Sequence, residues 1–285
     1  MEEIYLSEIA AWCNAETSSE GKIKTISTDS RVIDENTLFI ALKGERFDAN
    51  DFVDDVLEKN AKAVICSRYN GKSDRVLLVE DTGKALLDIA KGYREKFNIP
   101  FVALTGSVGK TTTKGMVHAV LSEKFNTLKT QGNLNNEIGV PKTLFCIDNS
   151  HEAAVIEMGM NHFNEISRLT NTVKPDIGII TNVGTAHIEN LGSREGILKA
   201  KYEITEGMKK GAPLIINGDN DMLMTINTED FEVIKFGIEQ DDLYMKAENI
   251  KFLPDGSEFT AICESEQVEA FVPAVGVHNV YNALF

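Results

Sequence analysis

Short apolar runs and stretches with helical spacing alternate along the N-terminal third of the chain. The apolar runs predict three buried strands, at residues 37–42, 63–66 and 76–79. Apolar residues at helical spacing predict helices over residues 4–11 and 50–60. This segment is therefore expected to fold as a small α/β domain, and we place its end near residue 82.

The same alternation continues after this boundary, with a helix expected over residues 83–97 before Pro100. The next apolar runs predict strands separated by segments long enough for crossover helices. They are found at residues 101–104, 153–156, 177–180 and 214–216. Runs of this kind are typical of a mostly parallel sheet that is covered on both faces.

The pattern changes from residue 231 to closely spaced strand-like segments. A turn at residues 254–257, Pro-Asp-Gly-Ser, favours a hairpin there. The chain is thus predicted to be an α/β protein with two domains, residues 1–82 and 83–285. The second domain is expected to carry a mostly parallel sheet, an antiparallel appendage and the start of a final helix near residue 281.

A glycine-rich turn, Thr-Gly-Ser-Val-Gly-Lys-Thr-Thr-Thr, occupies residues 105–113, between the predicted strand at 101–104 and a helix. Such a turn directs backbone N–H groups, a lysine and hydroxyls to one place, which suits a polyphosphate. Lys110 can pair with β/γ-phosphate oxygens, and the Thr111 hydroxyl can ligate Mg²⁺. Leu104 stands where the common phosphate-loop pattern has its first glycine. The predicted nucleotide-binding residues are Gly106, Ser107, Val108, Gly109, Lys110, Thr111 and Thr112.

Other nucleotide-binding patterns are not found in the sequence. It contains no G-x-G-x-x-G, which argues against a Rossmann dinucleotide fold, and no N-K-x-D after the loop, which argues against a GTPase. In the helix that follows the loop, Val117, Val120 and Leu121 recur at helical spacing and are expected to be core residues.

Composition narrows the class further. The net charge of -15 argues against a nucleic-acid surface and against attachment to anionic membranes. The four cysteines are widely spaced, with no C-x-x-C, so we expect free thiols. The N-terminus has no signal-peptide features, and no apolar run approaches the roughly 18 residues that span a bilayer. We expect a soluble, cytoplasmic and monomeric protein.

Several segments resemble the Mur ligases, which are ATP-dependent enzymes of peptidoglycan precursor synthesis. They are the loop at 105–113, Asn-Val-Gly-Thr-Ala-His at 182–187, Ala-Lys-Tyr-Glu-Ile at 200–204 and His-Asn-Val-Tyr-Asn-Ala-Leu at 278–284. Residues 28–31, 39–48 and 132–141 are most similar to the family members that join D-alanyl-D-alanine to UDP-N-acetylmuramoyl-tripeptide. The resemblance covers the whole chain in the family's order.

The resemblance implies a reaction. ATP would phosphorylate the terminal carboxylate of the UDP-linked peptide, and the amine of D-Ala-D-Ala would attack the acyl phosphate. The implied catalytic residues are Lys110, His187 and Lys201. Two Mg²⁺ ions are implied: Thr111 would ligate the ion shared with the phosphates, and Glu157 and His187 would hold a second ion that faces the acyl phosphate. Lys201 matches a lysine that is carbamylated in related Mur ligases.

The resemblance also assigns parts to the two predicted domains. Residues 1–82 would bind the UDP-peptide and residues 83–285 would bind ATP, with Asn279 and Asn282 in the segment that contacts adenine. The uridine-nucleotide-binding region would lie at residues 28–31 and 43–48. The substrate residues implied are Ser30, Arg31, Lys43, Gly44, Phe47 and Asp48, with Asn135 and Asn136 facing the substrate.

The family has a third, C-terminal domain, and the resemblance ends before it. We therefore expect residues 1–285 to bind ATP weakly and to join no D-Ala-D-Ala. Two alternatives stay open. One is a Mur ligase that adds a single diamino acid; the Asn-Leu-Asn-Asn segment at 133–136 argues against it. The other is a non-catalytic nucleotide-binding module.

Overall fold

The computed structural model of the protein describes residues 1–44, 47–264 and 266–285. It divides into two compact units. Met1–Asn98 and Pro141–Asn149 form the first unit, and Ile99–Val140 and Ser150–Phe285 form the second. The first unit extends past residue 82 because helix α3 (Thr82–Arg94) packs against helix α1 (Leu6–Trp12).

The first unit is built on a four-stranded parallel sheet in the order β3-β4-β5-β6. The two central strands are fully buried, as their continuous apolar runs predict. Its strands and helices, with the small antiparallel pair β1-β2, are β1 (Ile4–Tyr5), β2 (Lys22–Ile23), β3 (Thr25–Ser27), β4 (Thr37–Ile40), the 3-10 turn Ala49–Phe52, α2 (Val53–Glu58), β5 (Ala63–Cys66) and β6 (Val76–Leu78).

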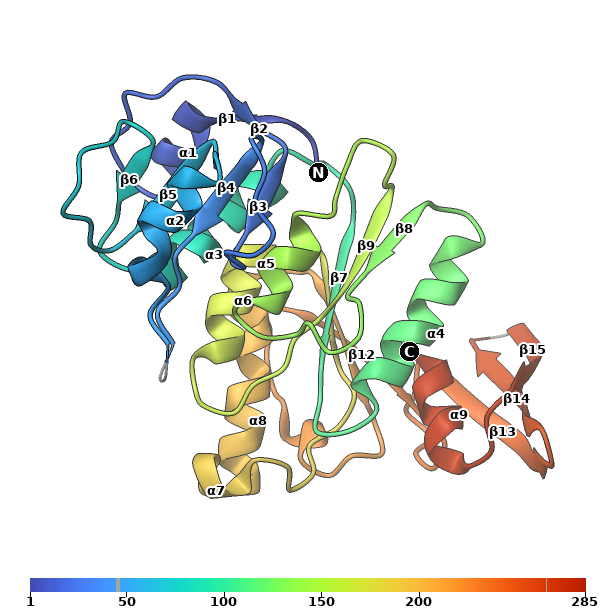
Figure 1. Ribbon diagram of the computed structural model, residues 1–285. Helices are drawn as coiled ribbons and strands as arrows, with labels where there is room; N and C mark the ends of the chain where they lie inside the picture. Colours follow the sequence, from blue (N-terminus) through green and yellow to red (C-terminus); the bar gives the residue numbers. More distant parts are fainter. Residues whose placement is uncertain (45–46, 265) are drawn as a thin grey trace. The chain divides into compact units, whose positions relative to one another are not determined.

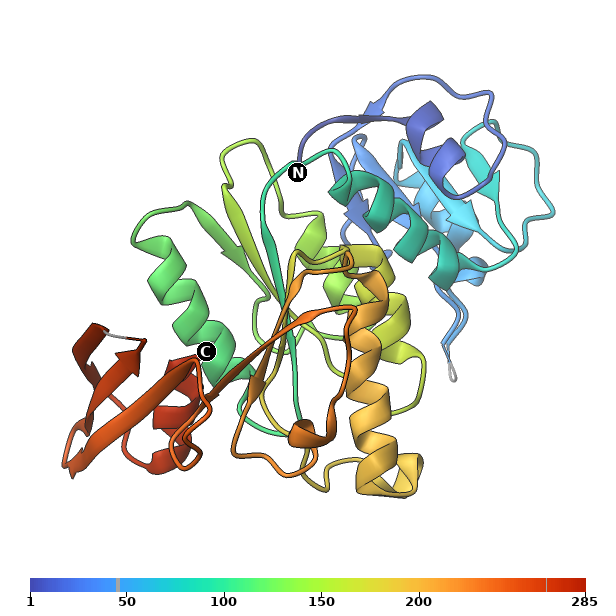
Figure 2. The ribbon, with the colours of Figure 1, turned by 180° about the vertical axis from the view of Figure 1, so that it is seen from behind.

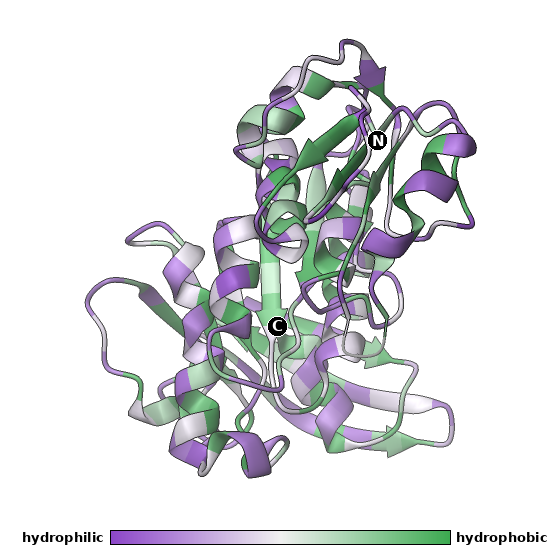
Figure 3. Cartoon of the chain, turned by 60° about the vertical axis from the view of Figure 1, so that its left-hand side comes forward, coloured by the Kyte–Doolittle hydropathy of each residue, from purple (hydrophilic) through white to green (hydrophobic). Residues whose placement is uncertain are grey.

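A nine-stranded sheet runs through the second unit in the order β15-β14-β13-β12-β11-β10-β7-β9-β8 (Figure 1). From β12 to β8 neighbouring strands are parallel. The parallel strands are β7 (Phe101–Thr105), β8 (Thr127–Lys129), β9 (Ala153–Glu157), β10 (Ile177–Ile180), β11 (Pro213–Asn217) and β12 (Glu232–Gly237). Figure 3 shows the central strands in the colour of hydrophobic residues, because helices cover them on both faces.

Helices α4 (Lys110–Ser122) and α9 (Val277–Leu284) lie on one side of this sheet (Figures 1 and 2). Helices α6 (Glu165–Val173) and α8 (Arg194–Tyr202) lie on the other side. The remaining short helices are α5 (Gly139–Leu144), α7 (Ile188–Leu191) and the 3-10 turns Glu203–Gly207 and Leu223–Thr225. The carboxyl ends of β7, β9 and β10 therefore meet at one edge, where α4 begins.

The appendage consists of β13 (Met245–Leu253), β14 (Gly256–Cys263) and β15 (Glu266–Val272), which pair antiparallel. The predicted α/β class, with a mostly parallel sheet and an antiparallel appendage, is confirmed. One detail differs, because residues 233–236 belong to β12, which is parallel to β11 and carries the parallel sheet one strand further. No helix of the described residues is long and apolar enough to cross a membrane.

One core prediction is wrong. Val117 and Leu121 pack against the cluster around Val102, Leu104 and Val155 on the sheet, but Val120 is 73% exposed. Residues 117 and 121 are four apart and share a helix face, whereas residue 120 is rotated away from it. Spacing of three and four residues alone does not fix which member of such a trio faces the sheet.

Candidate active site

The glycine-rich loop connects β7 to α4, as the sequence predicts. Its last glycine, Gly109, has φ +82°, a left-handed conformation that glycine adopts without strain, and it caps the N-terminus of α4. The Lys110 ammonium donates a hydrogen bond of 2.8 Å to the Gly106 carbonyl, so it folds over the loop. Lys110, Thr111 and the first N–H groups of a long helix thus face one place, which suits an anion.

Asn182, which follows β10, holds this loop in shape. Its side-chain oxygen accepts from the Val108 N–H at 3.0 Å, and its amide nitrogen donates to the Val108 carbonyl at 3.0 Å. Its backbone carbonyl also accepts from the Ser107 N–H at 3.1 Å. The neighbouring Thr181 hydroxyl donates to the Val108 carbonyl at 2.8 Å. The loop conformation is therefore fixed from the adjacent strand end before any ligand arrives.

Glu157 ends β9, the other neighbour of β7, and faces the first turn of α4. The Thr111 hydroxyl lies 3.4 and 3.2 Å from the two carboxylate oxygens of Glu157. The carboxylate is 1% exposed, and it is surrounded by the Asn135 amide at 2.8 Å and the Lys114 ammonium at 3.0 Å. The Glu157 N–H donates to the Thr130 hydroxyl. Thr111 and Glu157, which the resemblance assigns to two different Mg²⁺ ions, thus lie within hydrogen-bond distance of each other. Their roles as metal ligands stay predictions.

This pair of oxygen donors fits a magnesium ion chemically. Mg²⁺ prefers oxygen ligands, keeps several waters and is usually held by one or two protein groups together with phosphate oxygens. The hydroxyl of Thr105, at the end of β7, is buried with no hydrogen-bond partner among the described residues. Across those residues there is no cluster of three or more His, Cys, Asp or Glu groups that could hold a metal by themselves.

His187, the other predicted metal ligand, lies in the loop after β10. Its φ of +66° is left-handed, and the residue stands at the N-terminus of α7. No hydrogen bond of its ring to Glu157 or Thr111 is formed. The imidazole is partly exposed. His187 as a metal ligand therefore stays a prediction.

Lys201 lies in the last turn of α8 and is 2% exposed. Burial, with a smaller repulsion from the Lys110 ammonium, lowers its pKa to about 7. The pKa of Lys110 is also lowered by burial, and Glu157 opposes that shift. Two interacting lysines of lowered pKa, of which Lys110 also interacts with Glu157, mark this edge of the sheet as a candidate site with unusual proton chemistry.

The two asparagines predicted to contact adenine have different surroundings, although both lie on α9. Asn282 is 6% exposed, accepts a hydrogen bond of 3.2 Å from the Thr113 hydroxyl and lies against Gly109. Asn279 is half-buried, and its amide donates to the Val275 carbonyl just before its own helix. Asn282 therefore links α9 to the phosphate loop.

We expect Asn282→Ala to lower the free energy of unfolding by about 1–2 kcal/mol, because it leaves the buried Thr113 hydroxyl without its acceptor. Asn279→Ala, three residues earlier on the same helix, should change it by less than about 0.5 kcal/mol. Urea unfolding of both variants measures the difference. Equal losses in the two variants would contradict the link between α9 and the loop.

Asp219, which follows β11, holds α9 through a second contact, because its carboxylate accepts from the hydroxyl of Tyr281 on that helix. Burial opposes its ionisation, but N–H donors from Ile238, Glu239 and Gln240 and the Tyr281 hydroxyl outweigh burial and hold its pKa below the ordinary value. Since Tyr281 belongs to α9, Asp219 fixes that helix to the turn after β12. We read this residue as structural.

The substrate residues predicted in the first unit follow the carboxyl ends of β3 and β4. Arg31 is exposed and forms a two-pronged hydrogen bond with Asp29, at 2.9 and 2.7 Å, which holds the pKa of that carboxyl well below its usual range. The Ser30 carbonyl accepts from Lys59. The Arg31 guanidinium is therefore on the surface, with its remaining N–H groups directed to solvent.

The second predicted substrate segment forms a loop after β4. Lys43 and Asp48 pair across it as an isolated antiparallel bridge, and the Gly44 N–H donates to the Phe47 carbonyl at 2.8 Å. The Phe47 ring is 56% exposed and stacks on Phe52. Glu45 and Arg46, within the same predicted segment, lie outside the described residues. An exposed aromatic ring is compatible with stacking against a nucleotide base.

Asn135 and Asn136 separate in the structure. The Asn135 amide points at Glu157 and donates to it, whereas the Asn136 side chain accepts from the N–H groups of Ile138 and Gly139 at the start of α5. The two side chains therefore have different partners, and the prediction that both face a substrate stays a prediction. Asn136 is engaged in a local turn.

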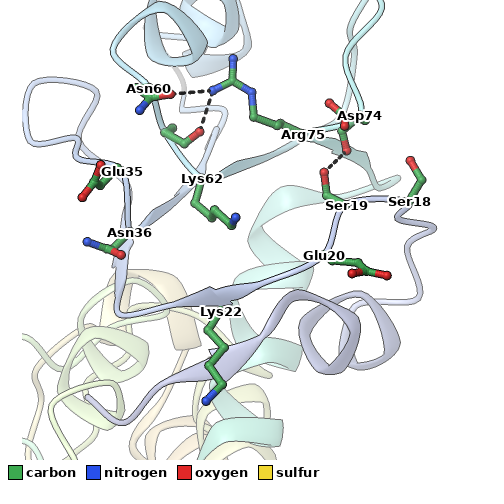
Figure 4. Close-up of a pocket in the computed structure, with 11 residues that line it drawn as sticks. Ser18, Ser19, Glu20, Lys22, Glu35, Asn36, Asn60, Lys62, Asp74 and Arg75 are labelled. Carbon is green, nitrogen blue, oxygen red and sulfur yellow. Dashed lines mark hydrogen bonds between the residues drawn. The ribbon is translucent and has the colours of Figure 1, made fainter.

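A polar pocket of about 670 Å³ opens at the opposite edge of the small sheet (Figure 4). Its walls come from residues that precede β4, β5 and β6, such as Asn36, Lys62 and Arg75. Arg75 donates to the Leu57 and Ala61 carbonyls, so its guanidinium is used by the fold. None of the residues predicted to bind substrate lines this pocket.

Sequence reasoning gave no role to two residues of the site, Asn182 and Lys114. Asn182 lies in the 182–187 segment, but its spacing gives no sign that it holds the loop. Lys114 follows Lys110 by one helical turn, and only the face they share could have indicated it.

Comparison with known proteins identifies the class to which this fold and site belong. Residues 104–285 match the Mur ligase middle domain, and residues 22–94 match the Mur ligase family catalytic domain. The chain belongs to the Mur ligase family.

Among individual relatives, the chain is 38% identical over 265 residues to the UDP-N-acetylmuramoyl-tripeptide–D-alanyl-D-alanine ligase of Bacillus subtilis (strain 168), covering 92% of this chain and 57% of that protein. Its fold is similar to that of MurF from Acinetobacter baumannii, with a TM-score of 0.94 and 34% identity. That match covers 100% of this chain and 64% of the Acinetobacter chain. The fold is also similar to that of MurF from Thermotoga maritima in complex with ADP, with a TM-score of 0.85 and 29% identity. That match covers 91% of this chain and 61% of the Thermotoga chain. The chain thus spans about three fifths of the length of these relatives.

Proposed function

We propose that this chain carries the UDP-peptide-binding and ATP-binding parts of an ATP-dependent ligase that joins D-Ala-D-Ala to UDP-N-acetylmuramoyl-tripeptide. The observation that carries the proposal is the grouping of Lys110, Thr111, Glu157 and Lys201 at the edge of the sheet where α4 begins. The names of the relatives and the ADP complex of one of them agree with it. Residues 22–94 of the chain, which match the family domain, supply the second substrate site.

The proposed roles follow from charge. A carboxylate and a γ-phosphate repel each other, so forming an acyl phosphate depends on positioning and on neutralising charge. Lys110 would leave the Gly106 carbonyl to pair with phosphate oxygens, and Thr111 with Glu157 would hold Mg²⁺. When bound, the ion would supply positive charge between the two anionic groups. In a chain of net charge -15, Lys110 brings a positive charge to this place.

Lys201 is proposed to react with carbon dioxide to form a carbamate. A lysine with a pKa of about 7 is largely neutral just above that pH, and the neutral amine is the nucleophile. No described residue is hydrogen-bonded to its amine. Carbamylation would replace a buried cation by an anion next to Lys110, which would relieve the repulsion between the two lysines and offer oxygen atoms to a metal ion.

In the first unit, Arg31 and Lys43 are proposed to meet the diphosphate of the UDP-peptide, and the exposed ring of Phe47 its base. They lie at the carboxyl ends of β3 and β4, the edge where parallel sheets bind ligands.

Ligand-induced stabilisation of residues 1–285 tests the proposal. We expect Mg²⁺-ATP to raise the melting temperature and Lys110→Met to remove that rise. UDP-N-acetylmuramoyl-tripeptide should raise it more than the corresponding dipeptide compound. Preference for the dipeptide would favour a ligase that adds a single diamino acid. No response to either peptide would leave a nucleotide-binding module, and no response to ATP would overturn the proposal.

A further inference from the structure

Lys114 is a buried cation that the proposed reaction does not yet use. It lies on α4 one turn after Lys110, and it is 3% exposed. Its ammonium is 3.0 Å from one carboxylate oxygen of Glu157, and it donates to the Gly132 carbonyl at 2.8 Å. Lys114 therefore connects three segments: the helix after the phosphate loop, the end of β9 and the loop after β8.

The two oxygens of Glu157 are held from different sides. Oε1 accepts from the Asn135 amide at 2.8 Å, and Oε2 pairs with the Lys114 ammonium. Asn135 is itself placed by the Gly159 N–H, which donates to its carbonyl at 2.8 Å. A carboxylate fixed at both oxygens cannot turn about its last bond. The Thr111 hydroxyl lies within 3.4 Å of both oxygens, so this fixed carboxylate faces the start of α4.

We propose that Lys114 is a positioning residue: together with Asn135 it holds the Glu157 carboxylate against Thr111, in the orientation that a nucleotide-bound divalent cation requires. The inference rests on the proposed function, because it assumes that Glu157 and Thr111 meet that cation. Partners that orient a metal ligand typically change metal affinity by about 10–100-fold when they are removed. Lys114 would act through Glu157 and not by its own contact with the nucleotide.

A purely electrostatic role of Lys114 would change the affinity for the cation in the opposite direction. If Lys114 acted only as a positive charge near the metal position, its removal would make cation binding tighter, because one repulsion is lost. If it only stabilised the fold, its removal would lower the melting temperature and leave the cation requirement unchanged. Orientation alone predicts that cation binding becomes weaker.

The experiment measures the Mg²⁺ concentration that gives half-maximal binding of a fluorescent ATP analogue to residues 1–285. We expect Lys114→Met to raise this concentration at least tenfold, with less than a twofold change in the binding measured in EDTA. Lys124→Met, an exposed lysine just after the same helix, is the matched control and should leave both unchanged. Glu157→Gln should shift the midpoint as well, and adding Lys114→Met to it should give no further shift.

Asn135→Ala keeps the inference testable if Lys114→Met does not fold. It removes the hydrogen bond to the other oxygen of Glu157 without leaving a charge unpaired. It should shift the midpoint in the same direction. An unchanged or lower midpoint in the folded variants would overturn the inference alone. Nucleotide binding by the parent chain that does not depend on Mg²⁺ would overturn the proposed function together with this inference.

Discussion

Gly106→Ala is expected to weaken Mg²⁺-ATP binding about 100-fold. A Cβ atom at this position would lie 1.9 Å from the Thr181 hydroxyl oxygen, so either the loop or the end of β10 has to move. Overpacking of this kind costs about 1–3 kcal/mol, and each 1.4 kcal/mol is a tenfold change in affinity. Because the Thr181 hydroxyl also holds the Val108 carbonyl, the displacement is transmitted to the whole loop. Isothermal titration with ATP and Mg²⁺ gives the change.

Gly115→Ala is the matched control for that variant. Gly115 lies in α4 shortly after the same loop, and apart from its chain neighbours and the backbone of its own helix no atom lies within 4 Å of the position that its Cβ would occupy. Alanine in place of a helical glycine should stabilise the protein by about 0.5–1 kcal/mol and leave ATP affinity unchanged. If Gly106→Ala binds ATP as tightly as Gly115→Ala does, close packing of the loop against Thr181 is not required for binding.

Lys201→Met is expected to stabilise the protein at neutral pH by roughly 3–5 kcal/mol in buffer free of carbon dioxide. The pKa of this amine falls from 10.5 to about 7 on folding, mainly because burial disfavours the ammonium. Methionine fills a similar volume without a charge. Urea unfolding of both proteins at pH 7, 8 and 9 measures the difference.

The sign of the pH dependence follows from proton counts. Between about pH 7 and 10.5 the unfolded chain keeps the Lys201 proton and the folded chain has lost it, so the parent gains stability as the pH rises. The advantage of Lys201→Met is therefore greatest at pH 7 and below, and it shrinks toward pH 10.5. Lys199→Met, an exposed lysine on the same helix, should change stability by less than about 0.5 kcal/mol. An advantage that grew with pH would contradict the lowered pKa.

The strands and the phosphate loop could be predicted from the sequence because they depend on local patterns. Buried parallel strands such as β7 and β9 are continuous apolar runs, and a loop that combines Gly106, Gly109 and Lys110 has few other uses. Glu157 could be placed at the carboxyl end of a strand because it ends such a run, whereas its role as a metal ligand came from the resemblance and stays a prediction.

The rest of the site depends on contacts between residues far apart in the chain. The partners of Glu157 come from α4 and from the loop after β8, and no periodicity relates Lys114 to Asn135. The parallel pairing of β12 has the same origin, since a strand's direction depends on how the chain returns to the sheet. Helical spacing placed Val120 in the core because it does not report which side of α4 the sheet covers.

The bond between the Lys110 ammonium and the Gly106 carbonyl has a consequence for ligand selection. Lys110 must give up its hydrogen bond to the loop carbonyl before it can pair with a ligand. The free energy that a ligand gains from Lys110 is therefore the difference between the new interaction with phosphate oxygens and the lost bond to the carbonyl. Under the proposed function, a triphosphate would offer charged oxygens within reach of Lys110 and make the exchange favourable. A nucleotide that lacks the terminal phosphates would leave the lysine on its own loop, so the ligand-free bond would favour triphosphates over shorter nucleotides.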